Sequence, residues 1–233
     1  MAKIKTIGLI GGMSWESSAE YYRIINERIT RRLGEAHSAK IIMFSIDFFE
    51  LCQLSKQNKW DEAATMMIDA AKKLEICGAN FLAICANTMH KVSDEVEKNI
   101  SIPLIHITDK TAEKIMTAGI KKVGLLGTKI TMEEAFYRHR LKEKYNIDTI
   151  TPNEADRDVI QGVIFEELCM GVVKDTSREK FKTIIQSLSK QGAQAVILGC
   201  TELTLLIKQA DTNIPLFDTT KIHAEAIADY AII

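Results

Sequence analysis

The stretch KTIGLIGG at residues 5–12 returns as KKVGLLGT at residues 121–128. Two further stretches return in the same order: GANFLAI (78–84) as GAQAVIL (192–198), and IPLIHITDKTAEKI (102–115) as IPLFDTTKIHAEAI (214–227). Three ordered matches at a period of about 115 residues are difficult to attribute to chance. The chain is therefore predicted to consist of two similar halves.

Short apolar runs alternate along the chain with longer segments of helical period, which is typical of a parallel sheet covered by helices on both faces. We expect buried strands at 6–11, 39–45, 80–85, 121–127 and 194–199, and short strands opened by proline at 102–107 and 214–218. We expect helices at 18–32, 60–76, 132–145 and 178–191, and a solvated turn at the charged run EADRD, 154–158.

These elements predict an α/β fold with two pseudo-symmetric lobes, each built on a parallel sheet. The first lobe is expected at 1–112 and the second at 113–221. The last segment, 222–233, has an apolar helical face that needs a partner, so we expect it to return to the first lobe. Because open α/β sheets bind ligands at the carboxyl ends of their strands, the active site is expected in the cleft between the lobes.

The composition argues against several classes of partner. The chain carries 30 basic and 31 acidic residues, so no strong field favours nucleic acid or an anionic membrane. No apolar run approaches the ~20 residues of a membrane helix, and the run near the N-terminus is too short for a signal peptide. The cysteines show neither a CxxC motif nor zinc spacing: Cys52, Cys77, Cys85, Cys169 and Cys200. We therefore expect a cytoplasmic protein with reduced thiols and no metal.

One thiol stands at a position that the repeat singles out. Cys200 lies eight residues after Gly192. The position eight residues after the matching Gly78 is Ala86, not Cys85. Because adjacent strand residues point to opposite faces, Cys85 is expected to be buried behind the site that Ala86 and Cys200 face. The Gly-Cys-Thr-Glu sequence favours a helix start, which would hold the pKa of the Cys200 thiol below its reference of about 8.5.

Longer motifs carry a resemblance to a known family. They are IGLIGGMSWES (7–17), NTMHK (87–91), LLGTKITMEEAFY (125–137), IFEEL (164–168), GCTEL (199–203) and FDTTKIHAEA (217–226). Together they resemble the aspartate/glutamate racemases over nearly the whole chain. The resemblance implies a racemase of acidic or similar small amino acids that works without a cofactor, and a homodimer. Nothing in the sequence identifies a lysine held for a Schiff base, so we expect no pyridoxal phosphate.

In that family one thiol at a strand end in each half faces the substrate. One thiolate removes the α-proton, and the opposite thiol delivers a proton to the other face. By resemblance, Cys200 is the thiol of the second half, and Glu202 is placed to tune or orient it. The resemblance assigns substrate binding to residues next to the two thiol positions and in the loops after the first strand of each half: Met13, Ser14, Asn87, Thr88, Thr128, Thr131, Thr201 and Glu202.

Ala86 departs from the family pattern, because it stands where the family has cysteine, or threonine in one branch. A methyl group can neither take nor give a proton. Three interpretations stay open: a racemase that takes this proton from water or another side chain, a degenerate or engineered site that only binds its amino acid, and a single-cysteine decarboxylase of the same superfamily. A ligand-sensing binding module on the same fold is a fourth hypothesis, and it predicts tight binding without α-proton exchange.

Two other features lie near the predicted site. The run IGLIGG (7–12) lacks the G-x-G-x-x-G spacing of a dinucleotide loop. We interpret its glycines as allowing close backbone approach to a small carboxylate. His90 follows the Asn87-Thr88 pair and is expected in the first turn of a helix; we interpret it as a structural residue, with ordering of the turn as the alternative.

Overall fold

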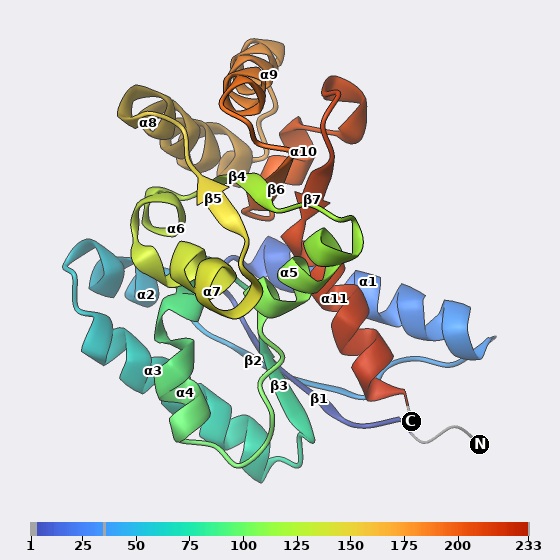
Figure 1. The fold of residues 1–233 in the computed structure, drawn as a ribbon. Coiled ribbons are helices and arrows are strands. Elements are labelled where there is room, and N and C mark those ends of the chain that lie inside the picture. The colour runs from blue at the N-terminus through green and yellow to red at the C-terminus, as the bar shows by residue number, and fades with distance from the viewer. Residues whose placement is uncertain (1–3, 35, 233) are drawn as a thin grey trace. The chain divides into compact units, whose positions relative to one another are not determined.

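The computed structural model describes residues 4–34 and 36–232. The chain folds into two compact units (Figure 1). Unit 1 is formed by Met1–Ile107 together with Thr220–Ile233, and unit 2 by Thr108–Thr219. The chain therefore passes from one unit to the other twice, after Ile107 and after Thr219.

Unit 1 is built on a three-stranded sheet with the strand order β2-β1-β3. Both strand pairs are parallel, with Ile7 opposite Ile41 on one side and opposite Phe81 on the other. The elements are β1 (Ile7–Gly11), α1 (Trp15–Leu33), β2 (Ile41–Ser45), α2 (Phe48–Lys56), α3 (Trp60–Ile76), β3 (Phe81–Ile84), the 3-10 helix η1 (Thr88–Val92), α4 (Ser93–Lys98) and, from the end of the chain, α11 (Thr219–Ala231).

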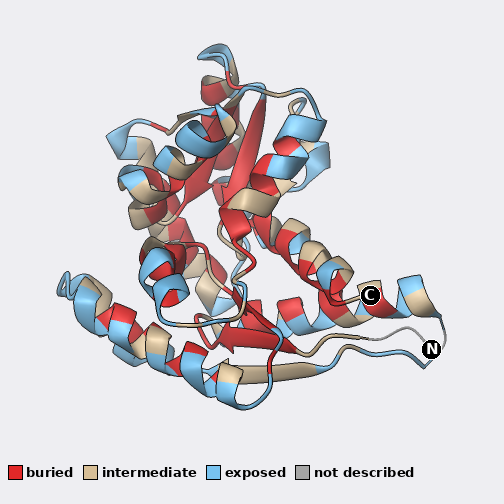
Figure 2. Cartoon of the chain, turned by 60° about the horizontal axis from the view of Figure 1, so that its bottom comes forward, coloured by how far each residue is buried: buried red, intermediate tan, exposed pale blue. Residues whose placement is uncertain are grey.

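Alternation along β1 gives this sheet two apolar faces. Ile7 and Leu9 pack with residues of α1 and α11. Ile10 packs instead with residues of α2, α3 and α4. Side chains alternate in this way because successive strand residues point to opposite faces. The strands β1 and β3 are buried on both faces (Figure 2), as the continuous apolar runs of a covered parallel sheet predict.

Unit 2 is built on a four-stranded parallel sheet with the strand order β5-β4-β6-β7. Its elements are α5 (Ile107–Thr117), β4 (Lys122–Gly127), α6 (Lys129–Glu133), α7 (Ala135–Tyr145), β5 (Asp148–Ile150), α8 (Glu154–Gly162), the π-helix η2 (Val163–Glu167), the 3-10 helix η3 (Leu168–Met170), α9 (Asp175–Lys190), β6 (Ala195–Gly199), α10 (Leu203–Leu206), the 3-10 helix η4 (Gln209–Asp211) and β7 (Leu216–Asp218).

The core of unit 2 repeats the arrangement of unit 1. On one face of its sheet, Val123 and Leu125 of β4 pack with residues of α5 and α7. On the other face, Leu126 packs with residues of α8 and α9. Two helices pack in a different unit from the chain segment that precedes them. Helix α5 follows the last segment of unit 1 but packs in unit 2. Helix α11 follows β7 of unit 2 but packs in unit 1. The predicted fold class, α/β with two parallel sheets, is confirmed.

Three local predictions are wrong. Residues 102–107 do not form a strand: Leu104 makes a single bridge to Leu82, and helix α5 begins at Ile107. The predicted helix 132–145 is two helices, because the backbone at Glu134 is extended. The charged run 154–158 is not a turn but the start of helix α8. Asn153 caps this helix, because its Oδ1 accepts a hydrogen bond from the backbone N–H of Asp156 in the first turn.

Candidate active site

The loop after β1 is held by short side chains. Ser18 is buried, and its hydroxyl accepts the N–H of Gly12 at 2.8 Å and donates to the carbonyl of Ser14 at 3.0 Å. Ser14 caps α1, because its Oγ accepts the N–H of Ser17 at 3.3 Å. Met13 is 6% exposed and its side chain belongs to the apolar cluster under α3. Of the two residues predicted here, Ser14 is therefore the one whose side chain lies outside the core.

Close contacts within the protein explain why two glycines stand in this loop. A Cβ on Gly12, whose φ is +89°, would lie 2.0 Å from the carbonyl oxygen of Ile46. A Cβ on Gly11 would lie 2.7 Å from the hydroxyl of Ser18. The close approach seen at these glycines is to the protein's own backbone and side chains. Close approach to a small carboxylate stays a prediction.

The end of β3 separates Cys85 from Ala86. Cys85 is fully buried in the cluster formed with α1 and α11, and burial raises the pKa of its thiol far above the usual value. Ala86 is partly exposed and packs on the opposite cluster, with α3. The prediction that Cys85 is buried and points away from Ala86 is confirmed. Asn87 is 6% exposed, and Thr88, partly exposed, begins η1.

Strand pairing brings these loops to one edge of the sheet in unit 1. Ile10 pairs with Ile84, and the N–H of Cys85 donates to the carbonyl of Ile10 at 2.9 Å. The loops after β1 and β3 therefore begin side by side. The same edge carries Asp47, an exposed residue after β2 whose carboxylate accepts the N–H of Phe49 at 3.0 Å. Sequence reasoning did not select Asp47; the available signal was an aspartate between a strand and a helix start.

In unit 2, the loop after β4 contains two threonines in contact. Thr128 caps α6, because its Oγ1 accepts the N–H of Thr131 at 3.4 Å. The two hydroxyl oxygens lie 3.1 Å apart. Thr131 is fully buried, whereas Thr128 is partly exposed. Of the pair, Thr128 is therefore the one that reaches the surface.

Cys200 lies at the end of β6 and is hydrogen-bonded to a carboxylate. Gly199 pairs with Gly127, so Cys200 follows the strand end next to the one that Thr128 follows. The Cys200 Sγ donates to Glu202 Oε2 at 2.9 Å. Glu202 lies in a turn that spans residues 201–204, in which the N–H and the hydroxyl of Thr204 both donate to the carbonyl of Thr201. The structure thus places a thiol, a hydroxyl and a carboxylate on three consecutive residues.

The direction predicted for the pKa of Cys200 is wrong. Desolvation by burial raises the pKa of the thiol well above its ordinary value, and the negative charge of Glu202 and the hydrogen bond to it raise it further. The helix that follows, α10, begins only at Leu203 and has four residues. Its N-terminus therefore offers little to offset a carboxylate 2.9 Å from the sulfur. Burial and the neighbouring carboxylate thus both favour the thiol form of Cys200 over the thiolate.

Some kinds of site are not found among residues 4–34 and 36–232. This part of the chain has no group of three or more histidine, cysteine, aspartate and glutamate side chains that could hold a metal ion. Within the same residues, no helix is both long and apolar enough to cross a membrane.

The chain thus combines two α/β units, polar loops at the carboxyl ends of the central strands, and a thiol hydrogen-bonded to a carboxylate in unit 2. The chain belongs to the Asp/Glu/hydantoin racemase family, whose sequence profile matches residues 10–227.

Individual relatives agree with this assignment. The chain is 28% identical, over 166 residues, to the broad specificity amino-acid racemase RacX of Bacillus subtilis (strain 168), and the match covers 71% of each chain. A solved structure from Yersinia pestis, assigned to the Asp/Glu racemases, is 50% identical with a TM-score of 0.93 over 98% of this chain and 99% of that chain. An aspartate racemase homologue from Pyrococcus horikoshii OT3 is 38% identical with a TM-score of 0.85, again covering 98% and 99%.

Proposed function

We propose that the chain is an amino-acid racemase that acts on aspartate, glutamate or a similar small amino acid without a cofactor, and that Cys200 exchanges the α-proton. The observation that carries this proposal is the hydrogen bond from Cys200 Sγ to Glu202 Oε2 at a strand end, in a chain of the racemase family. The relatives named above, a structure assigned to the Asp/Glu racemases, an aspartate racemase homologue and a broad specificity amino-acid racemase, support the choice of substrate class.

In this proposal the thiol works together with its carboxylate. Cys200 rests protonated, so it can deliver a proton to a carbanion directly. To remove an α-proton it must first become a thiolate, and the Glu202 carboxylate, 2.9 Å from the sulfur, is the group placed to take that proton. The hydroxyls of Thr88, Thr128 and Thr201, together with backbone N–H groups at the strand ends, hold the α-carboxylate and stabilise the developing charge.

Ala86 occupies the position of the second acid/base group in this proposal. Inversion needs an acid and a base on opposite sides of one carbon, and a methyl group supplies neither. Cys200 therefore serves one face of the α-carbon, and the proton for the other face comes from water or from another side chain. Racemisation is accordingly expected to be slow relative to exchange on the Cys200 face.

Deuterium exchange tests the proposal. Each enantiomer of aspartate and glutamate is incubated with the protein in deuterated water, and α-deuterium and enantiomer ratio are followed by NMR and chiral chromatography. We expect one enantiomer to gain α-deuterium faster than it inverts. Equally fast labelling and inversion of both enantiomers would show that both faces are served. Binding of the amino acid without any labelling would favour a binding module.

A single-thiol decarboxylase is the second candidate, and Ala86 is the observation that favours it. A protonated thiol on one face is sufficient to protonate the carbanion that remains when carbon dioxide leaves. Release of carbon dioxide from an α-substituted malonate, together with no exchange on aspartate or glutamate, would replace the racemase proposal with this one.

The expected assembly rests on the resemblance to the racemase family, and the expected compartment rests on the free thiols. Among the described residues all five cysteines are free. We expect a homodimer in the cytoplasm that needs no pyridoxal phosphate. Size-exclusion chromatography with light scattering measures the oligomeric state, and an absorbance band from bound pyridoxal phosphate in the purified protein would contradict the expectation of a cofactor-independent enzyme.

A further inference from the structure

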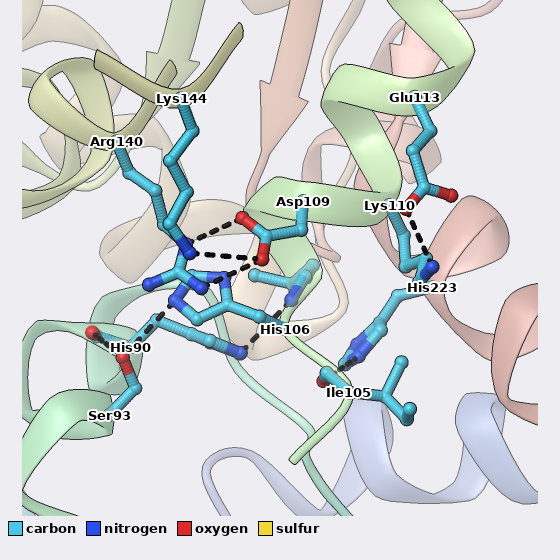
Figure 3. A network of polar contacts seen from close by, with 11 residues as sticks. His90, Ser93, Ile105, His106, Asp109, Lys110, Glu113, Arg140, Lys144 and His223 are labelled. Carbon is cyan, nitrogen blue, oxygen red and sulfur yellow. Dashed lines mark hydrogen bonds and ion pairs between the residues drawn. The ribbon is translucent and has the colours of Figure 1, made fainter. Parts of the chain in front are cut away.

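Three buried histidines of unit 1 gather around the segment where the chain leaves this unit (Figure 3). His90, His106 and His223 are 2%, 4% and 0% exposed. The ring of His90 lies between the other two, with centroid distances of 4.4 Å to His106 and 5.9 Å to His223. The proposed chemistry uses none of them, so their arrangement requires its own explanation.

The two ring nitrogens of His90 have opposite roles. Nδ1 lies 2.7 Å from the carbonyl oxygen of Ala86. A carbonyl only accepts hydrogen bonds, so Nδ1 carries the proton. The backbone N–H of Ile107 donates to Nε2 at 3.2 Å, so Nε2 carries none. The bond from Ile107 therefore selects the tautomer that can donate to Ala86.

The other two histidines hold the neighbouring residues of the same segment. His223 donates from Nε2 to the carbonyl of Ile105 at 2.7 Å, while its Nδ1 accepts from the hydroxyl of Tyr21 at 2.8 Å. His106 Nε2 lies 3.1 Å from the Oγ of Ser93, which donates to the carbonyl of His90 at 2.8 Å. Residues 105–107 are thus fixed by buried hydrogen bonds, and His90 is anchored on a segment that is itself held in place.

We infer that His90 is a positioning residue: its Nδ1–H fixes the turn of Ala86, Asn87 and Thr88, and the N–H of Ile107 holds the imidazole in the tautomer that this requires. The functional meaning of this role rests on the proposed function, because that proposal assigns the turn to proton transfer and substrate binding. The physical role does not depend on it. His90 acts through the carbonyl of Ala86 and touches no reacting atom.

Two amide variants separate the two hydrogen bonds. The side-chain amide of His90→Asn reaches the place of Nδ1, so it can still donate to Ala86 but cannot reach Ile107. The longer side chain of His90→Gln reaches the place of Nε2, so it can accept from Ile107 but leaves the carbonyl of Ala86 without its donor. Hydrogen–deuterium exchange of a peptide covering 85–91, read by mass spectrometry, reports on the turn. We expect His90→Asn to exchange like the starting protein and His90→Gln about tenfold faster, since one net hydrogen bond is lost.

His223→Asn is the matched control. It keeps an acceptor for Tyr21 and loses the donor to Ile105, so it also removes one buried histidine hydrogen bond from the same network. We expect it to lower Tm without faster exchange in the 85–91 peptide. Equal exchange in His90→Asn and His90→Gln, or equal acceleration in His223→Asn and His90→Gln, would overturn the positioning role.

The readouts distinguish this inference from the proposed function. Amide exchange needs no turnover, so a loosened turn in His90→Gln supports the positioning role even if no amino acid is labelled in deuterated water. If the protein is active, His90→Gln should raise KM for the amino acid while His90→Asn stays close to the starting protein. If His90→Gln does not fold, ring ¹⁵N shifts of the histidine-labelled starting protein decide: a protonated Nε2 on His90 overturns the inference, and a protonated Nδ1 with a bare Nε2 supports it.

Discussion

The end of β3 in unit 1 and the end of β6 in unit 2 are matching places with different chemistry. Each strand is preceded by a glycine in the left-handed region, Gly78 with φ +93° and Gly192 with φ +94°. Eight residues later come Ala86 and Cys200. Ala86 packs on the cluster formed with α3, and Cys200 packs on the cluster formed with α9, the helix before the strand in each unit.

The two places differ in the local backbone and in the side chains: the 3-10 helix η1 begins at Thr88, whereas the short helix α10 begins at Leu203. The turn after β3 carries a methyl group, an amide and a hydroxyl, whereas the turn after β6 carries a thiol, a hydroxyl and a carboxylate. The repeat therefore supplies two matching places near strand ends, and in the proposed function the side chain at each place decides whether a proton can be moved there. Both halves keep their cores although only one keeps a titratable group at this place.

The largest expected effect comes from removing the thiol of Cys200, which Ala86 lacks at the matching position. Cys200→Ala should abolish α-proton exchange on aspartate and glutamate, a loss of at least the ~10²–10⁴-fold that a general acid–base group contributes. Deuterium incorporation measured by NMR checks this. Cys77→Ala, at an exposed cysteine, is the control and should exchange normally. Retained exchange in Cys200→Ala would remove Cys200 from the mechanism.

A thiol at position 86, matching the thiol of Cys200, should restore proton transfer on the second face of the α-carbon. Ala86→Cys should raise the rate of racemisation by a factor on the order of 10²–10⁴, because it supplies the second acid/base group that the proposed function requires. Polarimetry or chiral chromatography measures the inversion. Ala86→Ser has a similar size but a far less acidic group, so it should gain little. No gain in Ala86→Cys, with fast racemisation already in the starting protein, would show that Ala86 is not at a proton-transfer position.

The repeat made much of the fold readable from the sequence. Buried strands such as β4 and β6 are continuous apolar runs, and their predicted ends lie within one residue of the observed ones. The helix predicted at 60–76 is α3. Strand β5 escaped prediction because it is a three-residue edge strand with one exposed and two partly exposed residues, so burial leaves no apolar pattern. Helix α8 escaped because its first turn is charged, and its cap, Asn153, was not recognised as a start signal.

The places of Cys200 and Cys85 in the fold were predictable from the sequence, whereas the electrostatics of Cys200 were not. Counting from matched glycines placed Cys200 at a strand end and Cys85 in the core, because backbone periodicity alone decides on which side a residue lies. The pKa of Cys200 is raised first by burial and then by the carboxylate of Glu202, whose side chain turns back onto the thiol. Spacing in the sequence determines neither the burial of the thiol nor this contact, whereas the Gly-Cys-Thr-Glu sequence indicates only a helix N-terminus.

A smaller effect tests the contact that distinguishes the Cys200 turn. Glu202→Gln removes the charge and the charged acceptor that raise the pKa of the thiol, so the pKa of Cys200 should fall, although burial still keeps it raised. More thiolate is then present at neutral pH, and alkylation of Cys200 by iodoacetamide should be several-fold faster. Alkylation rate against pH, read by peptide mass spectrometry, measures this. Glu179→Gln, an exposed carboxylate of α9, is the control; an unchanged profile in Glu202→Gln would contradict the coupling.

The smallest expected effect concerns Cys85, the thiol that directly precedes Ala86 in the chain. Its side chain is fully buried among residues of α1 and α11, on the face away from Ala86. Cys85→Ala removes one buried heavy atom, so the free energy of unfolding should fall by about 1 kcal/mol, while α-proton exchange stays unchanged. Urea unfolding measures the first quantity and deuterium labelling the second, with Cys77→Ala expected within about 0.5 kcal/mol of the starting protein. Loss of exchange in Cys85→Ala at unchanged stability would mean that the thiol of unit 1 is Cys85 after all, and that the place matching Cys200 had been assigned one residue too far along the chain.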